Sequence, residues 1–132
     1  MALVILIIDD DEAVRFFHRI IVTQSGLSTE PLCFSNGIEA LAHLDKNFNS
    51  NNNYLILLDI NMPVMDGWDM LYALDSKNYC SQVNVVMVTS SVDKTDFNRA
   101  KQFKTVIDFV EKPLSDKAYK KVMDFFSVLQ SL

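Results

Sequence analysis

The sequence predicts an α/β protein built on a five-stranded, doubly wound parallel sheet with helices on both faces. Continuous aliphatic runs recur along the chain, which is typical of parallel strands buried on both sides. Each run is followed by a segment whose apolar residues have helical spacing. Helical connections make successive strands parallel, and right-handed crossovers distribute the helices over both faces of the sheet.

The stretch 54–67 organises the rest of the chain. Aliphatic residues 55–58 lead directly into Asp59, and Pro63 and Gly67 then indicate a loop. Asp59 is therefore expected at the carboxyl end of a central parallel strand, where open α/β sheets bind their ligands. Considered alone, the same aspartate could equally serve as a helix cap or turn former.

The other elements follow in β-then-α order. Strands are expected at residues 3–8, 29–34, 83–88 and 105–110, and helices at 12–25, 36–46, 66–76, 93–103 and 115–129. Pro31 interrupts the second strand, which favours an edge position in the sheet. The asparagine-rich tract 47–53 is expected to be a solvated loop. The five units make one domain, residues 1–132, without an internal linker.

The spacing of apolar residues and the positions of the two histidines concern the predicted helices. The apolar residues of the first helix recur at helical spacing, namely Ala13, Phe16, Phe17, Ile20 and Ile21. His18 and His43 lie on predicted helices away from the carboxyl ends of the strands. Both are therefore interpreted as ordinary surface or half-buried residues.

The bulk composition narrows the functional classes. The 132 residues suffice for one domain with a proper core, and 49% hydrophobic with 22% charged residues is typical of a globular chain. Twelve basic against seventeen acidic residues give a net charge of −5, which argues against a nucleic-acid partner. The apolar start at 2–8 is too short to span a membrane and lacks the features of a signal peptide. Isolated Cys33 and Cys80 indicate reduced thiols, so a cytoplasmic protein without membrane contact is expected.

Polar side chains follow four of the predicted strands where each strand ends. They are Asp9 and Asp10, Asp59, Thr89 and Lys112. Each alone could be a cap or a surface residue, but the architecture brings all of them to one edge of the sheet. Clustered carboxylates repel one another, and a hard divalent cation such as Mg²⁺ relieves that repulsion.

This set suits phosphoryl transfer to a carboxylate. Such transfer depends on positioning and on neutralising the charge of the phosphoryl oxygens, more than on an acid or base. Lys112 would supply a fixed positive charge, the metal a second one, and the Thr89 hydroxyl a hydrogen bond. Asp59 is the predicted nucleophile because it comes from the middle strand, between the other two carboxylates and the lysine.

Four segments carry a resemblance to a known family: residues 7–10 (IIDD), 58–67 (LDINMPVMDG), 87–90 (MVTS) and 109–114 (FVEKPL). The chain resembles the receiver domains of two-component response regulators, whose CheY-like, flavodoxin-like fold has the strand order 2-1-3-4-5. The resemblance covers essentially the whole chain, and its second segment is the most specific.

The resemblance implies that Asp59 accepts a phosphoryl group from a histidine of a sensor kinase or a histidine phosphotransfer protein. Asp10 and Asp59 would bind Mg²⁺ or Mn²⁺ directly, together with the backbone carbonyl of Asn61, and Asp9 would act mainly through water. Asn61 and Ser91 would flank the path of the attacking water and tune dephosphorylation.

The resemblance also implies a two-state switch. Lys112 would pair with the phosphate, and the Lys112–Pro113 peptide bond would be cis. Thr89 would move toward the phosphoryl oxygens, and Phe109 would turn into the space that it leaves. A downstream target protein would bind the face formed by the fourth helix and the fifth strand, whereas the first helix would meet the kinase.

Some alternatives remain open at this point. The chain could be a stand-alone receiver, a receiver cut from a larger regulator or hybrid histidine kinase, or a phosphorylation-independent binding module, and either a monomer or a weak homodimer. We expect no enzymatic activity beyond promotion of its own phosphorylation and dephosphorylation. An aspartate-nucleophile phosphatase needs an acid two residues after the nucleophile, and Asn61 cannot act as that acid. A flavin carrier is disfavoured because the three aspartates after the first strand would repel a phosphate.

The sequence departs from the family pattern at one junction: residues 103–108 lack the glycine that is common there in receiver domains.

Overall fold

The computed structural model describes residues 2–24, 30–90 and 93–131, with side chains up to residue 124 in the last helix. Five parallel strands form one sheet in the order β2-β1-β3-β4-β5. The strands are β1 (Ala2–Ile8), β2 (Leu32–Phe34), β3 (Asn52–Asp59), β4 (Val83–Thr89) and β5 (Val106–Glu111). The predicted fold class and strand order are confirmed.

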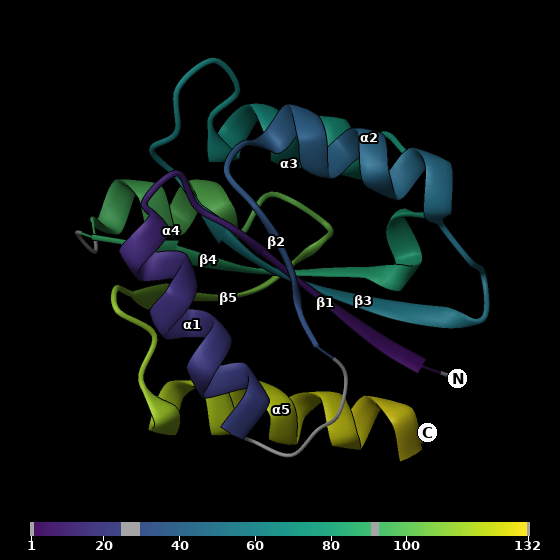
Figure 1. The fold of residues 1–132 in the computed structure, drawn as a ribbon. Helices are drawn as coiled ribbons and strands as arrows, with labels where there is room; N and C mark the ends of the chain where they lie inside the picture. The colour runs from purple at the N-terminus through teal and green to yellow at the C-terminus, as the bar shows by residue number, and fades with distance from the viewer. Residues whose placement is uncertain (1, 25–29, 91–92, 132) are drawn as a thin grey trace.

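Helices cover both faces of this sheet. They are α1 (Glu12–Gln24), α2 (Gly37–Asn47), α3 (Gly67–Asp75), α4 (Lys94–Ala100) and α5 (Asp116–Ser131), with a short 3₁₀ turn, η1 (Cys80–Gln82). Figure 1 shows α2, α3 and α4 on one side of the sheet and α1 and α5 on the other. Among the described residues, no helix is both long enough and apolar enough to cross a membrane.

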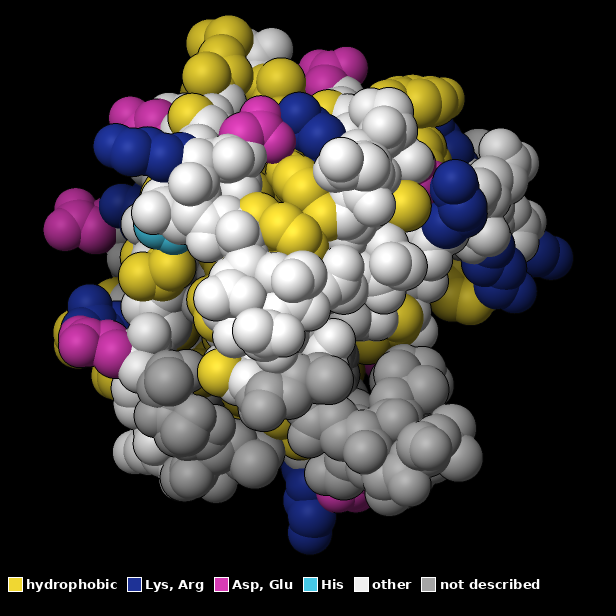
Figure 2. Space-filling model, turned by 90° about the vertical axis from the view of Figure 1, so that its right-hand side faces the viewer, with side chains coloured by type: hydrophobic (Ala, Val, Ile, Leu, Met, Phe, Trp, Pro, Cys, Tyr) yellow, Lys and Arg dark blue, Asp and Glu magenta, His cyan; other side chains and the backbone are white. Residues whose placement is uncertain are grey.

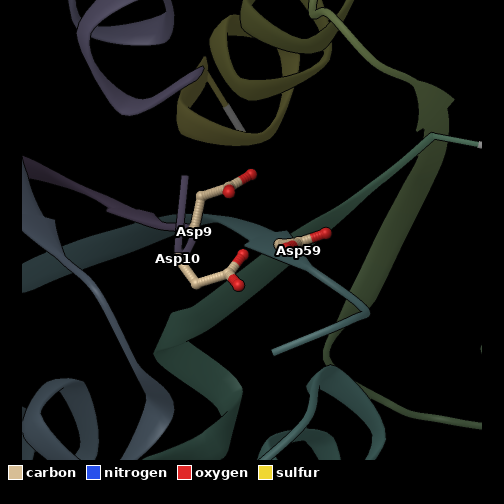
Figure 3. A group of neighbouring side chains, drawn as sticks. All are labelled: Asp9, Asp10 and Asp59. Atoms are coloured by element: carbon tan, nitrogen blue, oxygen red, sulfur yellow. The ribbon is translucent and has the colours of Figure 1, made fainter. Parts of the chain in front are cut away.

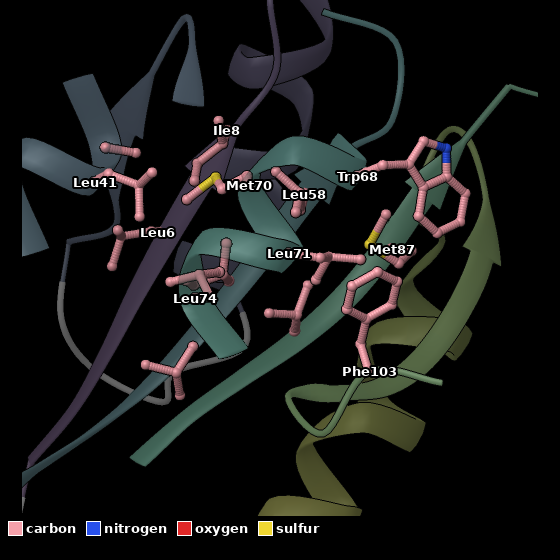
Figure 4. Packing of buried hydrophobic residues seen from close by; sticks show 14 of the residues in the cluster. Leu6, Ile8, Leu41, Leu58, Trp68, Met70, Leu71, Leu74, Met87 and Phe103 are labelled. Carbon is pink, nitrogen blue, oxygen red and sulfur yellow. The ribbon is translucent and has the colours of Figure 1, made fainter. Parts of the chain in front are cut away.

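Successive side chains of each strand point to opposite faces of the sheet, so the buried residues form two cores, one on each face. Leu6 and Ile8 of β1 face α2, α3 and α4, and their core includes Met70 and Leu71 of α3 (Figure 4). The intervening Ile7 faces the other way, into the core under α1 and α5. Successive side chains of a strand point to opposite faces, so a strand covered on both sides has to be apolar throughout.

The asparagine-rich tract differs from the prediction. Asn52 and Asn53 belong to β3, because their backbones pair in parallel with Ala2 and Leu3 of β1. Backbone pairing does not require apolar side chains, and both asparagine side chains lie at the half-buried start of the strand. The predicted loop 47–53 is therefore shorter than expected, and β3 begins two residues before Tyr54.

The buried side of α1 contains a polar residue, and two aromatic residues lie on its exposed side. Phe16 is 66% exposed and Phe17 is 43% exposed, whereas the buried residues of the helix are His18, Ile21 and Val22. The helical spacing of the apolar residues predicted the helix, which is confirmed, but it does not identify the buried side, because a histidine occupies a core position there. The remaining boundaries agree with the predicted segments within a few residues, except that α4 ends earlier, at Ala100.

The side chain of Asp75 holds the turn before β5, in the junction 103–108 that lacks a glycine. The carboxylate of Asp75, at the end of α3, accepts hydrogen bonds from the backbone N–H of Lys104 at 2.8 Å and of Thr105 at 3.2 Å. It also accepts one from the Thr105 hydroxyl at 2.8 Å. Backbone groups at this turn are thus satisfied without a glycine.

The two ends of the sheet have different surfaces. Figure 2 shows the end where the strands begin: hydrophobic side chains are visible at its centre among backbone and uncharged side chains, and most charged side chains lie toward the margin. A shallow hollow at this end is lined by Val4, Leu44, Asn47, Asn52 and Tyr54, among others. The acidic residues singled out in the sequence lie at the opposite, carboxyl end.

Candidate functional site

Three carboxylates converge at the carboxyl end of the sheet. Ile8 pairs with Leu58 in the β1–β3 ladder, so the next residues, Asp9 and Asp59, leave neighbouring strands at the same level. Carboxylate oxygens of Asp9, Asp10 and Asp59 lie within 4.8 Å of one another (Figure 3). Asp9 and Asp59 are 2% and 3% exposed, whereas Asp10 is exposed. The structure thus brings together the three predicted acidic residues.

Lys112 reaches this cluster from the loop after β5. Its Nζ lies 2.7 Å from Oδ2 of Asp9 and 2.9 Å from Oδ1 of Asp59. Burial lowers the pKa of this ammonium group, but hydrogen bonds to the two carboxylates outweigh the effect and raise its pKa above the usual value. Lys112 therefore stays charged and offsets part of the repulsion between the carboxylates.

The Asp59 carboxyl has a strongly shifted pKa. Burial is the main cause and raises the pKa to about 6, and repulsion from Asp9 and Asp10 adds to the shift. The hydrogen bond from Lys112 acts in the opposite direction without cancelling it. An additional positive charge near Asp59 would therefore favour the ionised carboxylate, which is the nucleophilic form.

The three aspartates after β1 have different roles. The Asp11 carboxylate caps α1 by accepting hydrogen bonds from the N–H groups of Ala13 and Val14, at 2.9 and 3.3 Å. The Asp9 carboxylate accepts the Asp11 N–H at 2.9 Å, and Arg15 donates to the Asp9 carbonyl oxygen at 2.6 Å. Helix capping is thus done by Asp11, which leaves the other two aspartates directed at the cluster.

Close packing fixes the loop after β3. The N–H of Gly67 donates to the carbonyl of Ile60 at 2.8 Å. A Cβ atom at Gly67 would lie 2.6 Å from the carbonyl oxygen of Asp59, so only glycine fits here. Asp66 caps α3 in a reciprocal capping box with Asp69. The start of α3 is therefore held directly against the residue that carries the central carboxylate.

One further predicted residue, Asn61, lies in this loop, where it is exposed two residues after Asp59. Val64 of the same loop is 87% exposed with a φ of 71°. A positive φ is uncommon for a β-branched residue, so this loop contains a strained position. Ser91, the other residue expected to tune dephosphorylation, lies outside the described residues.

The predicted switch residues lie on β4, β5 and the loop that follows. Thr89 is buried at the end of β4, and its carbonyl accepts the N–H of Lys112 at 2.6 Å. Phe109 is 9% exposed and packs edge-to-face on Phe97 of α4, with ring centroids 5.8 Å apart. The Phe109 ring thus already faces inward, and no rotation is needed to bury it. The Lys112–Pro113 peptide bond is cis.

One residue near the site was misjudged from the sequence. His18 was expected to lie away from the carboxyl ends of the strands, but it is 1% exposed and its Nε2 accepts the N–H of Leu114 at 3.0 Å. Leu114 is two residues after Lys112, so the prediction for His18 was wrong. The spacing of α1 residues contained a weak signal, since His18, Ile21 and Val22 share one side of a helix.

The carboxylate cluster fits a hard divalent cation. Three carboxylates from two adjacent strands supply oxygen ligands at one point, and Mg²⁺ prefers such ligands while keeping several waters. Lys112 alone balances only one of their negative charges. The residues present therefore suit such an ion.

Comparison with known proteins defines the class. The family model "Response regulator receiver domain" matches residues 5–124, and the chain therefore belongs to this family and is a receiver domain of two-component signalling. The chain is 23% identical to chemotaxis protein CheY1 of Helicobacter pylori, over 91% of its own length and 93% of that protein. It is 29% identical to response regulator Rcp1 of Synechocystis sp., over 70% of its own length and 65% of that protein.

A solved structure agrees with this assignment. The two-component response regulator from Cytophaga hutchinsonii superimposes with a TM-score of 0.81 at 25% sequence identity. The match covers 94% of this chain and 95% of that one. The resemblance first seen in four short segments of the sequence therefore extends to the whole arrangement of strands and helices.

Proposed function

We propose that Asp59 accepts a phosphoryl group from a phosphohistidine of a sensor kinase or a histidine phosphotransfer protein. The N–P bond of the donor breaks as a bond forms between phosphorus and a carboxylate oxygen of Asp59, which gives an acyl phosphate. The observation that carries this proposal is the buried Asp59 carboxylate, held 2.9 Å from Lys112 Nζ and beside two further carboxylates.

The residues around Asp59 supply what phosphoryl transfer requires. Lys112 provides a permanent positive charge. Its ammonium group can move from a carboxylate oxygen to a phosphoryl oxygen, because it lies at the end of a flexible four-carbon chain. Asp9, Asp10, Asp59 and the Asn61 carbonyl would hold Mg²⁺ or Mn²⁺. When bound, this ion supplies positive charge for the phosphoryl oxygens and favours the ionised form of Asp59.

A change in charge at Asp59 would be coupled to the α4–β5 face. Thr89 shares a backbone hydrogen bond with Lys112, and Phe109 lies one strand away beneath Phe97. We expect the Thr89 hydroxyl to approach the phosphoryl oxygens and the Phe97–Phe109 packing to adjust, which would alter binding of a downstream target protein there. Asn61 and Ser91 would set the rate at which water removes the phosphate.

The proposed activity is limited to the protein itself. Asn61 occupies the position where an aspartate-nucleophile phosphatase has its acid, and an amide cannot protonate a leaving group. The chain would thus promote its own phosphorylation and dephosphorylation, without acting on other substrates.

The test is the intact mass after incubation with acetyl phosphate, with Mg²⁺ or with a chelator, for the native chain and Asp59→Asn. We expect a gain of one phosphoryl group that requires the metal and is absent in the variant. Incorporation at normal yield in Asp59→Asn would remove Asp59 as the acceptor. No incorporation in the native chain would instead indicate a phosphorylation-independent binding module.

A further inference from the structure

His18 links helix α1 to the loop that carries Lys112. Its side chain is 1% exposed, and its Nε2 accepts the N–H of Leu114 at 3.0 Å. A buried polar ring needs a partner, and a buried backbone N–H needs an acceptor, so each group satisfies the other. Leu114 is fully buried in the core under α1 and α5, which fixes this contact in place.

The backbone around Lys112 is fastened on both sides. Its own N–H donates to the carbonyl of Thr89 at 2.6 Å, which ties the loop to the end of β4. Pro113 has no N–H, so the next donor along the chain is that of Leu114. His18 binds this donor. The two attachments therefore flank the residue whose ammonium group lies on Asp9 and Asp59.

The contact requires the neutral form of His18. Nε2 accepts a hydrogen bond only when it carries no proton, which places the proton of the neutral ring on Nδ1. Burial is the main cause that lowers the pKa of His18. The Asp9 carboxylate on β1 acts against this shift, and the Lys112 ammonium reinforces it. The acceptor form is thus favoured at neutral pH.

We propose that His18 is a positioning residue for Lys112: by accepting the Leu114 N–H, it holds the β5–α5 loop so that the ammonium group reaches Asp59. The inference deepens the proposed function and rests on it for the effect on phosphorylation. The position of Lys112 itself can be observed separately. No ion and no titration step is needed for this role.

Two kinds of variant separate the hydrogen bond from simple packing. His18→Gln keeps an acceptor oxygen near the place of Nε2, whereas His18→Leu and His18→Met fill the space without one. His43→Leu is the control, because His43 lies on α2 and its ring contacts Phe34 of β2 and Asn47 of α2, not the Lys112 loop. All variants are first compared with the native chain by thermal unfolding.

The main readout is the rate of phosphoryl incorporation from acetyl phosphate at saturating Mg²⁺. We expect about a tenfold lower rate in His18→Leu and His18→Met, because the free energy of one lost hydrogen bond, if it adds to the activation barrier, lowers the rate by about that factor. The rate of His18→Gln should stay within about threefold of the native rate, as for His43→Leu. Equal rates in all variants, or a loss in His18→Gln as large as in His18→Leu, would overturn the proposal.

NMR gives a readout that does not depend on phosphorylation. In the native protein we expect a scalar coupling across the hydrogen bond between Leu114 N and His18 Nε2, and Lys112 Nζ signals shifted by the adjacent carboxylates. The Lys112 signals should persist in His18→Gln and revert to those of a free lysine in His18→Met. Absence of the coupling, or unchanged Lys112 signals in folded His18→Met, would refute the positioning role. If the native chain accepts no phosphate but Lys112 responds as expected, only the proposed function fails.

Discussion

The ammonium group of Lys112 lies 2.9 Å from Oδ1 of Asp59 and joins the end of β3 to the loop after β5. The same group lies 2.7 Å from Asp9, so one cation serves two buried carboxylates. A buried charge is costly unless it is paired, and two carboxylates with one lysine leave the pairing incomplete. Burial therefore keeps the pKa of Asp59 high, because the single lysine does not offset it, and this shift is the basis of the first prediction.

Removal of the Asp59 charge should alter how stability depends on pH. The ordinary pKa of this carboxyl is 3.8, whereas burial raises it to about 6 in the folded protein. The folded state therefore holds the proton more tightly, and the free energy of unfolding falls as the pH rises from about 4 to about 6. Without metal, Asp59→Asn should gain about 2 kcal/mol relative to the native chain between pH 4 and pH 7.

Urea unfolding at several pH values, in the presence of a chelator, measures this difference. Asp45→Asn is a control of opposite sign, because hydrogen bonds from Tyr79 and Lys77 lower the pKa of Asp45. Its carboxylate stabilises the fold above the ordinary pKa and loses this effect in acid. A constant difference between native chain and Asp59→Asn across the pH range would contradict the raised pKa.

Lys112→Ala should separate phosphorylation from the response to it. The variant keeps Asp59 and the acidic cluster, so metal-dependent incorporation of phosphate should still occur, at a lower rate. The positive charge that pairs with the phosphoryl group is gone, and we expect the response at Thr89 and Phe109 to disappear. Amide chemical shifts of these two residues, before and after phosphorylation, provide the measurement.

Lys77→Ala is the matched control for this experiment. Lys77 also pairs with an aspartate, but its partner Asp45 lies on α2, away from the carboxylate cluster. Its removal should leave both incorporation and response unchanged. Shifts of normal size at Thr89 and Phe109 in phosphorylated Lys112→Ala would show that the coupling does not pass through the lysine.

A divalent cation should stabilise the native chain through the acidic cluster. A ligand at 100 times its dissociation constant adds about 2.7 kcal/mol, which corresponds to a rise in Tm of about 10 °C for a chain of this size. Asp10→Asn should lose most of this rise because it removes an exposed member of the cluster without disturbing the core. The measurement is thermal unfolding with and without Mg²⁺ or Mn²⁺.

Asp11→Asn distinguishes a specific site from general screening of the acidic surface. Its side chain caps α1, and asparagine caps a helix equally well. We expect the full metal-dependent rise in Tm in this variant. An equal loss in Asp10→Asn and Asp11→Asn would point to diffuse attraction of cations instead of binding at the cluster.

The fold and the acidic cluster could be predicted from the sequence because both depend on local patterns. Aliphatic runs mark strands that are buried on both faces, and the residue that ends each run lies at a common edge whatever the details of packing. Asp9, Asp59 and Lys112 were found in this way. Their distances and the pKa of Asp59 depend on burial from several elements, and no sequence pattern contains that information.

Contacts between distant segments account for what the sequence did not predict. His18 interrupts the apolar pattern of α1, so the spacing gives only a weak signal of its burial, and its partner is the N–H of Leu114 in a distant loop. Asp75 accepts hydrogen bonds from Thr105, 30 residues further along the chain. In both cases a polar side chain satisfies backbone donors elsewhere, and local propensity does not report such partners.

Gly67→Ala should destabilise the protein strongly and alter the surroundings of Asp59. An added Cβ would lie 2.6 Å from the carbonyl oxygen of Asp59 and 2.8 Å from Cα of Ile60, both of them backbone atoms. Backbone cannot yield as a side chain can, so α3 or the end of β3 has to move. We expect a loss of about 3 kcal/mol in the free energy of unfolding, measured with urea.

Gly37→Ala is a closely matched control, because Gly37 is also the first residue of a helix. Its added Cβ would meet Met65 Sδ at 3.0 Å and Met70 Sδ at 3.4 Å, which belong to flexible side chains. We expect a change within about 1 kcal/mol in either direction. A loss in Gly37→Ala as large as in Gly67→Ala would show that helix starts in general, and not the approach to Asp59, require glycine here.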